Sequence, residues 1–198
     1  MIDSTFKMQF SDIEKQHLLK AWIAVSLAFA ILMSDIFSLN FIIYFVISLV
    51  TVGTGFLFHE LAHKLVAQKY GCWAEFRADD KMLIMAILSA FVGFVFAAPG
   101  AVFIHGNVTI ERNGKISYAG PATNVLLALL FFCLTLLIPM GLINSTFNYG
   151  FQINSFIALF NMIPFLNFDG EKILKWNKPI YFITLSIAIF FVIFPRIL

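Results

Sequence analysis

The sequence predicts an all-α membrane protein: a compact polytopic bundle of about six transmembrane helices, forming a single domain over residues 1–198. Of the 198 residues 61% are hydrophobic and only 12% are charged, about half the charged share of an ordinary soluble domain. So few polar side chains could not cover the surface of a soluble fold of this size. The composition also excludes intrinsic disorder, and the two cysteines fit no disulfide framework.

Six apolar stretches are candidates for membrane spans. A helix needs about 20 apolar residues to cross the hydrocarbon core of a bilayer. The first stretch follows a polar N-terminal segment with no small-residue cleavage site, so we expect it to remain as an anchor. The candidate spans are residues 18–34, 41–67, 82–98, 122–143, 149–163 and 180–197.

The stretch between the third and fourth spans, residues 99–121, has a different composition. It is rich in strand formers such as Val102 and Ile104, and Asn113-Gly114 is typical of a two-residue hairpin turn. The sequence therefore predicts a re-entrant β-hairpin here. Open strand edges are tolerated at membrane depth only when they are buried in protein or line a wet cavity, so the hairpin would indicate a polar cavity.

The distribution of Lys and Arg predicts the orientation in a cell membrane. Basic residues precede the first span and follow the second and fifth, whereas residues 35–40 and 144–148 contain none. By the positive-inside rule the N-terminus is expected to be cytoplasmic. The second span then ends inside and the fourth begins inside, so the third cannot be a lone crossing. Either residues 82–98 turn back, or the extended segment after them re-enters the membrane.

A metal-binding motif lies near the end of the second span, where residues 59–63 read His-Glu-Leu-Ala-His. On a helix His59 and His63 share one face, so both imidazoles can bind one metal ion. Glu60 lies about 100° further around the axis, where it can reach a metal-bound water. Such residues are costly within an apolar helix and are functional by default. The alternative is a polar helix end that reaches the membrane interface.

Asp169 is the candidate for a third protein ligand, which a catalytic zinc site requires. It lies where Pro164 ends the fifth span and an apolar, irregular stretch follows. Broken helices at membrane depth line sites, and the predicted topology places Asp169 on the same side as the end of the second span. The alternative is an ordinary Asp-Gly turn at a helix exit.

Three motifs occur in order within residues 41–175. They are His-Glu-Leu-Ala-His at 59–63, Ala-Gly-Pro-Ala-Thr-Asn at 119–124, and the segment 161–170, which contains Asn161, Pro164 and Asp169-Gly170. Together they resemble the site-2 protease family of intramembrane zinc metalloproteases, whose patterns are HExxH, AGPxxN and NxxPxxPxDG. Asn167 stands where the family pattern has its second proline.

The resemblance implies one zinc ion per chain, with His59, His63 and Asp169 as ligands and Glu60 as the catalytic base. It implies hydrolysis of a peptide bond in or near a transmembrane segment of a membrane-protein substrate. Residues 101–118 could then pair with an unwound substrate by strand addition.

Other polar residues have less defined expectations. Asn124 and Asn161 could steady the substrate or satisfy groups within the bundle. His105 is expected to be a structural or interface residue, and His17 has no expected role. Besides the substrate the expected partner is the lipid bilayer. Nucleic acid is not expected, because the net charge is only +2 and no basic run occurs.

Two other functions fit the same residues. One is a non-proteolytic homologue that binds zinc as a membrane scaffold. The other is a metal or proton transporter that uses these ionisable groups as a relay. A transporter should distribute such groups through several spans, whereas here the polar groups converge at one depth. The sequence therefore favours a single site over a pathway.

Overall fold

The computed structural model describes residues 8–95, 99–138 and 140–193, and most of them are helical, as predicted. Some helix starts have ordinary side-chain caps. The side chain of Ser11, for example, accepts a hydrogen bond from the backbone N–H of Glu14 at the start of the first helix. The elements are α1 (Asp12–Met33), α2 (Phe41–Ser48), the π-helical turn η1 (Leu49–Gly53), α3 (Thr54–Lys69), β1 (Trp73–Ala78), α4 (Asp80–Ala90), β2 (Gly100–His105), α5 (Ile110–Leu137), α6 (Leu142–Asn161), α7 (Asp169–Trp176) and α8 (Lys178–Ile193).

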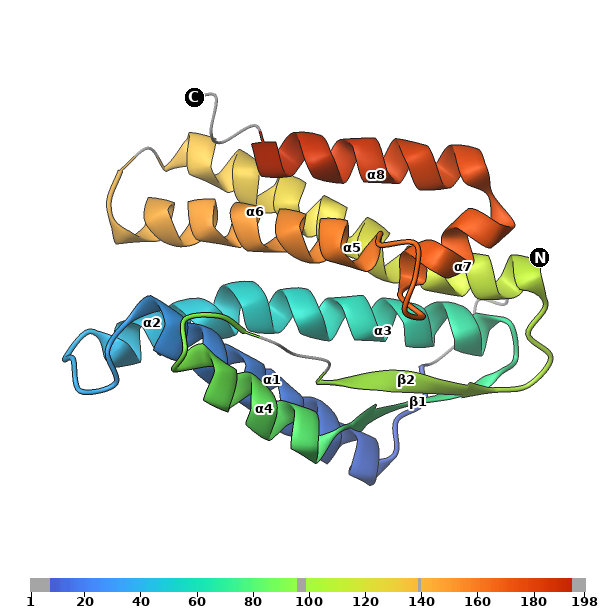
Figure 1. Cartoon of the computed structure of the whole chain (residues 1–198), viewed down its shortest axis with the longest axis horizontal. Helices are drawn as coiled ribbons and strands as arrows, with labels where there is room; N and C mark the ends of the chain where they lie inside the picture. Colours follow the sequence, from blue (N-terminus) through green and yellow to red (C-terminus); the bar gives the residue numbers. More distant parts are fainter. Residues whose placement is uncertain (1–7, 96–98, 139, 194–198) are drawn as a thin grey trace.

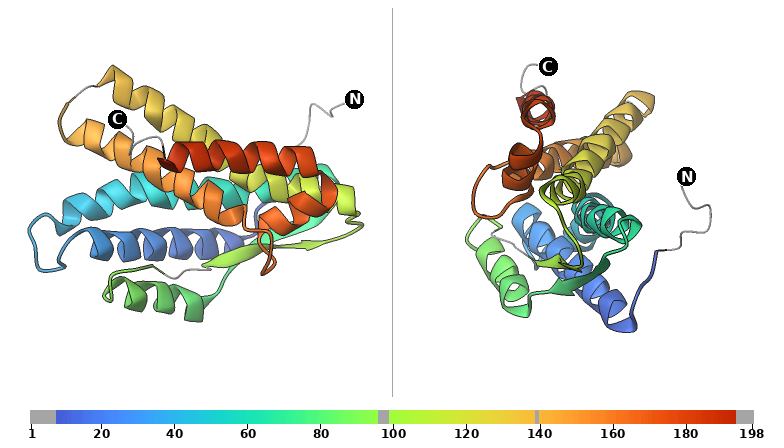
Figure 2. Two further views of the ribbon diagram at one scale, coloured as in Figure 1. Left: turned by 45° about the horizontal axis from the view of Figure 1, so that its top comes forward. Right: turned by 90° about the vertical axis from the view of Figure 1, so that its right-hand side faces the viewer.

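The helices lie in two layers (Figure 1). One layer holds α1 to α4 with the two strands, and the other holds α5 to α8; α3 and α5 pack together where the layers meet. The further views show the long helices side by side along one axis (Figure 2). Fully buried alanines on α1 at positions 21, 28 and 30 let its neighbours approach closely.

Within the described residues three helices are long and apolar enough to cross a membrane: α1, α5 and the continuous helix Phe41–Lys69 formed by α2, η1 and α3. Large apolar side chains such as Ile42, Leu126 and Leu136 are exposed on them, as expected of surfaces that face lipid. Helices α6 and α8 correspond to the fifth and sixth predicted spans, although residues 194–197 lie outside the described part. The structure thus supports a membrane protein and, by length and composition, three of the six predicted spans.

The third predicted span, residues 82–98, does not run from one end of the molecule to the other. Helix α4 ends after 11 residues, and β2 begins with Gly100 opposite Ala78, the residue at which the chain left β1. Residues 96–98 lie outside the described part. The chain therefore turns back on itself between β1 and β2, which is the first of the two alternatives that the distribution of basic residues left open.

The predicted β-hairpin with a turn at Asn113-Gly114 is wrong. Strand β2 pairs antiparallel with β1, which precedes α4, and Asn113 and Gly114 lie near the start of α5. Thr109 provides the physical reason, because its side chain accepts a hydrogen bond from the N–H of Arg112 and caps a helix there. Glu111 in the first turn adds a favourable interaction with the helix dipole.

Candidate metal centre

Two distant segments bring three metal-binding side chains together. Helix α3 places His59 and His63 one turn apart on its buried face, and α7 begins with Asp169 beside them. The two Nε2 atoms are 3.0 Å apart. Oδ2 of Asp169 lies 3.3 Å from Nε2 of His59 and 3.1 Å from Nε2 of His63. All three residues are buried.

These separations fit a tetrahedral zinc ion. Zinc bonds to nitrogen and oxygen of about 2.0–2.1 Å place tetrahedral ligand atoms about 3.3 Å apart, close to the three distances found here. Imidazole nitrogens and a carboxylate oxygen are ordinary zinc ligands, and three protein ligands leave the fourth position open, as in catalytic zinc sites. The residues present can therefore hold the ion.

Hydrogen bonds on the far side of each imidazole fix which nitrogen faces the centre. Nδ1–H of His63 donates to the carbonyl oxygen of Ile116 at 2.8 Å, and a carbonyl oxygen can only accept. Nδ1–H of His59 donates to Oδ1 of Asn124 at 2.6 Å, and Nδ2 of Asn124 donates to the carbonyl of Gly55. Each ring therefore directs its Nε2 to the centre, which is how metal-bound histidines are usually oriented.

Asn124 is held in turn by Asn154 of α6. Nδ2 of Asn124 also donates to Oδ1 of Asn154 at 3.0 Å, and Nδ2 of Asn154 donates to the carbonyl of Gly150 at 2.9 Å. Both asparagine side chains are fully buried. This network joins α3, α5 and α6 at the centre. Of the two roles expected for Asn124, these contacts are the one within the bundle. Asn154 was not among the candidate residues, although an amide in an apolar helix was an available signal.

Two glycines of the motifs allow close approach at the centre. A Cβ atom on Gly120 would overlap Nε2 of His63 and lie 2.6 Å from Cε1 of His59, so α5 can lie against the imidazoles only with glycine there. A Cβ atom on Gly170 would overlap the carbonyl of Met162. Gly170 therefore lets α7 begin against the end of α6, and this places Asp169.

The connection between α6 and α7 explains why Asn167 replaces the second proline of the family pattern. Leu166 and Asn167 have φ angles of 57° and 61°, in the left-handed region that asparagine tolerates better than most residues. Proline cannot adopt this angle, because its ring fixes φ near −65°. The N–H of Asn167 also donates to Oε2 of Glu171 at 3.1 Å. The loop thus follows a course that proline would forbid.

Acidic groups complete the electrostatics of the centre. Glu60 is half-buried and interacts electrostatically with His59, His63 and Asp169. Burial on its own raises the pKa of Asp169, but its interactions with His63 and His59 outweigh burial and lower the pKa below its ordinary value. Asp169 is therefore a carboxylate, the form that binds a metal ion.

Three other residues considered from the sequence lie elsewhere. Asn161 donates from Nδ2 to the carbonyl of Ile157 in its own helix at 3.0 Å. The ring centroid of His105 lies 5.2 Å from that of Trp73, and His105 is exposed. Nδ1 of His17 accepts a hydrogen bond from a backbone N–H of β1, which gives this residue a role that the sequence did not indicate.

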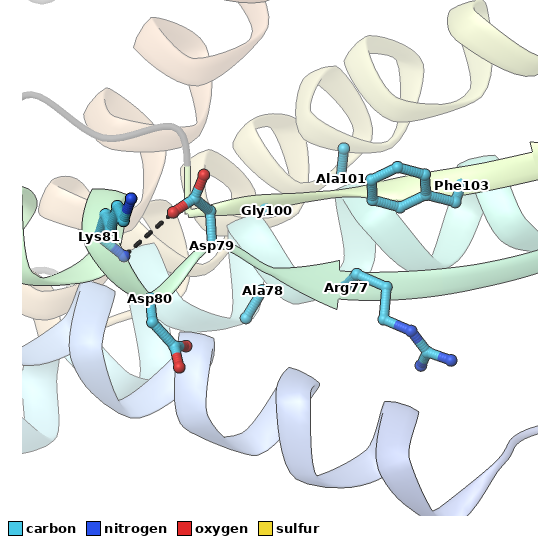
Figure 3. A pocket seen from close by; sticks show the side chains of 8 residues that line it. All are labelled: Arg77, Ala78, Asp79, Asp80, Lys81, Gly100, Ala101 and Phe103. Atoms are coloured by element: carbon cyan, nitrogen blue, oxygen red, sulfur yellow. Dashed lines mark hydrogen bonds between the residues drawn. The ribbon is translucent and has the colours of Figure 1, made fainter.

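A separate hollow of about 590 Å³ lies where β1 meets α4 (Figure 3). Its lining includes Asp79, Asp80 and Phe103 but none of the three metal-binding side chains. Its acidic groups already have partners, because Asp79 caps α4 and Asp80 is paired with Lys20. The hollow is therefore not part of the candidate metal centre.

The fold is helical, with helices long and apolar enough to span a membrane, and the centre brings together three side chains that could hold a metal ion. The chain is 53% identical over 146 residues to "Putative zinc metalloprotease MJ0611" of Methanocaldococcus jannaschii, covering 72% of this chain and 76% of that protein. It is 29% identical over 158 residues to "Putative zinc metalloprotease YwhC" of Bacillus subtilis, covering 70% and 71%. No family model and no solved structure matches the chain. The chain belongs to the zinc metalloprotease family of these relatives.

Proposed function

We propose that this protein is an intramembrane zinc metalloprotease of the site-2 protease type, which hydrolyses peptide bonds in or near transmembrane segments of membrane proteins. The observation that carries the proposal is the position of the centre. His59, His63 and Asp169 converge on a buried point beside helices that are long and apolar enough to span a membrane. The names of the relatives support the zinc metalloprotease part of the proposal.

In this proposal His59, His63 and Asp169 hold one zinc ion per chain. When bound, zinc would supply Lewis-acid activation of water and polarisation of the substrate carbonyl. Glu60, beside His59 in the sequence, accepts a proton from the attacking water at its carboxylate and donates it to the leaving amine. Asn124 keeps the ring of His59 in the orientation that presents Nε2.

Helix ends support the proposed orientation in a cell membrane. The start of α1, the end of α3, the start of α5 and all of α7 carry basic residues and lie at one end of the molecule (Figure 1). The α1–α2 and α5–α6 connections lie at the other end and contain no Lys or Arg. We therefore propose a multi-pass protein with a cytoplasmic N-terminus. Its crossings are α1, the helix 41–69, α5, α6 and α8, with α4 as a partial insertion.

The edge of β2 that faces away from β1, with which no other strand of the described residues pairs, is the proposed place for the substrate backbone. In the antiparallel register Phe76 faces Val102, and the N–H of Phe76 points away from β2 to a side chain. Because ladder hydrogen bonds alternate, Val102 and Ile104 must direct their backbone groups away from β1. An unwound substrate segment could add there as a third strand.

Glu60→Gln tests the proposal, with a library of single-span peptides containing Gly and Pro, reconstituted in liposomes, as substrates. We expect wild type to release peptide products, and the variant to retain about one zinc per chain with cleavage at least ~100-fold slower. Glu111→Gln is the matched control, because Glu111 is paired with Lys115 at the start of α5. Cleavage that survives Glu60→Gln would overturn the role of the base.

Wild-type behaviour separates the alternatives. Zinc binding without any peptide product would favour a non-proteolytic homologue and would overturn the proposed function. Zinc or proton flux across the liposome membrane without peptide product would favour a transporter and would overturn it as well. Cysteine-accessibility labelling of residues 35–40 in cells tests the orientation, since these residues should react with impermeant reagents added from outside.

A further inference from the structure

The outer edge of β1 is covered by side chains from two helices. In a two-stranded sheet this edge would otherwise be open to another strand. Three successive outward-facing residues of β1 each have one backbone group bonded to a side chain. The carbonyl of Ala74 accepts from Nε2 of Gln68 at 3.2 Å, the N–H of Phe76 donates to Oε1 of Glu14 at 2.8 Å, and the N–H of Ala78 donates to Nδ1 of His17 at 3.1 Å. We call Glu14, His17 and Gln68 the edge clamp.

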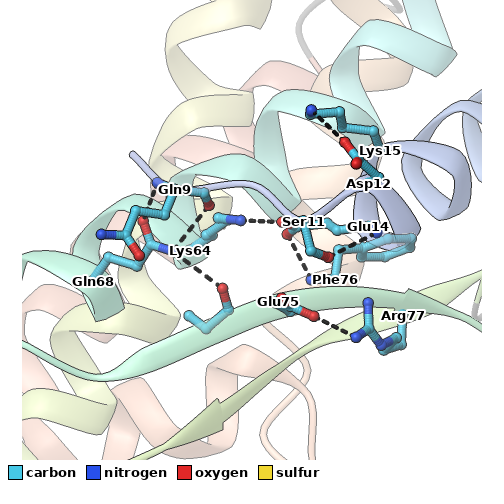
Figure 4. Close-up of polar contacts among 11 residues, drawn as sticks. Gln9, Ser11, Asp12, Glu14, Lys15, Lys64, Gln68, Glu75, Phe76 and Arg77 are labelled. Atoms are coloured by element: carbon cyan, nitrogen blue, oxygen red, sulfur yellow. Dashed lines mark hydrogen bonds and ion pairs between the residues drawn. The ribbon is translucent and has the colours of Figure 1, made fainter. Parts of the chain in front are cut away.

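Glu14 connects the edge clamp to the helix that carries the metal-binding histidines. Its second carboxylate oxygen forms an ion pair with Lys64, the residue that follows His63, and neither side chain of the pair has exposed surface (Figure 4). Nζ of Lys64 also lies 4.1 Å from the centre of the Phe10 ring. A single carboxylate therefore joins α1, α3 and β1.

The burial of this ion pair indicates a role other than stability. Removing two charges from water costs about as much as their attraction returns, so apolar replacements of buried pairs are often neutral or stabilising. The best-attested use of such pairs is to fix one arrangement of the parts that they join. Here the parts are the strand pair and the metal-bearing helix.

We propose that the edge clamp is a positioning device that presents the substrate to the metal centre in one register. It blocks strand addition at β1 and leaves β2 as the edge for the substrate, while Glu14 and Lys64 hold the sheet at a fixed place along α3. A shift of the substrate strand by two residues moves it by about 7 Å, so the place of β2 along α3 decides which peptide bond meets the centre. This inference rests on the proposed protease function.

Two double variants separate the hydrogen bond from the ion pair. E14Q/K64M removes both charges but keeps a side-chain oxygen for the N–H of Phe76. E14L/K64M removes both charges and that oxygen as well. The two variants therefore differ only at position 14, where one carries an amide and the other an alkyl side chain. Zinc content is measured for both, because the clamp does not touch the metal ligands and the content should stay near one per chain.

The first readout is amide hydrogen exchange in peptides that cover residues 73–78 and 100–105, and it requires neither zinc nor substrate. We expect exchange about tenfold or more faster in E14L/K64M than in wild type, and within about threefold of wild type in E14Q/K64M. The second readout is the cut sites in the peptide library, mapped by mass spectrometry. We expect additional sites in E14L/K64M and the wild-type sites in E14Q/K64M.

Exchange and cut sites that stay as in wild type in E14L/K64M would overturn the inference, and so would equal changes in the two double variants. If E14L/K64M does not fold, His17→Leu removes a second acceptor of the same edge and leaves the buried pair intact. It should speed exchange in β1 and add cut sites, and an unchanged result would again overturn the inference. If wild type cuts no peptide, the proposed function fails, while the exchange measurement still decides whether the clamp holds the sheet.

Discussion

Replacing Asn124 with leucine should weaken zinc binding without touching a ligand. The change leaves Nδ1–H of His59, the carbonyl of Gly55 and Oδ1 of Asn154 without their partner at the centre. Loss of a partner that orients a metal-bound histidine costs about 10- to 100-fold in metal affinity, which corresponds to about 1.4–2.7 kcal/mol. Each buried polar group left unpaired also costs about 1–3 kcal/mol of folding stability.

The assay is competition for zinc against a chromophoric chelator in detergent micelles, with thermal unfolding measured in parallel. Asn161→Leu is the matched control, because Asn161 donates only to a carbonyl in its own helix, and we expect it to change zinc affinity less than about threefold. Asn124→Asp keeps an oxygen for His59 but loses the amide donor, so it should fall between wild type and Asn124→Leu. Equal zinc affinity in Asn124→Leu and Asn161→Leu would refute the reasoning.

Three further predictions concern the close contacts and the ion. Gly120→Ala places a methyl group against the imidazoles and should weaken zinc binding at least ~10-fold in the same competition assay; unchanged affinity would mean that α5 can move away. Asn167→Pro cannot adopt the φ of 61° and should lower zinc occupancy, whereas Asn167→Gly should retain it; equal occupancy would contradict the assigned loop course. Removing zinc with EDTA should lower the unfolding temperature of wild type. The free energy of unfolding should fall by up to about 4 kcal/mol where free zinc had been 1,000-fold above its Kd. Asp169→Ala should show little response to EDTA, and a full response would exclude Asp169 as a ligand.

The sequence identified the groups at the centre because lipid makes polar residues informative. His59 and His63 could be paired from their spacing on one helix. Asp169 could be added because the charge pattern placed it on the same side of the membrane. Asn154 could not be recognised in this way, because its role depends on packing between α3, α5 and α6, which no spacing within one helix encodes.

The secondary structure between the third and fourth predicted spans could not be predicted from local signals. Asn113-Gly114 is a strong hairpin signal by itself, yet the Thr109 cap and the contacts of α5 with its neighbours favour a helix there. Strand β2 pairs with β1, which precedes α4 in the sequence. Strand pairing across an inserted helix is a tertiary property that local sequence signals do not encode.

The residues of the candidate metal centre and the strand pair beside it are both held by contacts to helix α3. One face carries His59 and His63, which are bonded to α5 through Asn124 and Ile116. Lys64, only one residue on, points to α1 and is bonded to Glu14, which holds β1. Both sets of contacts are buried, and in an apolar bundle such polar groups can be satisfied in only a few arrangements. The position of the strand edge relative to the histidines is therefore fixed within this one helix.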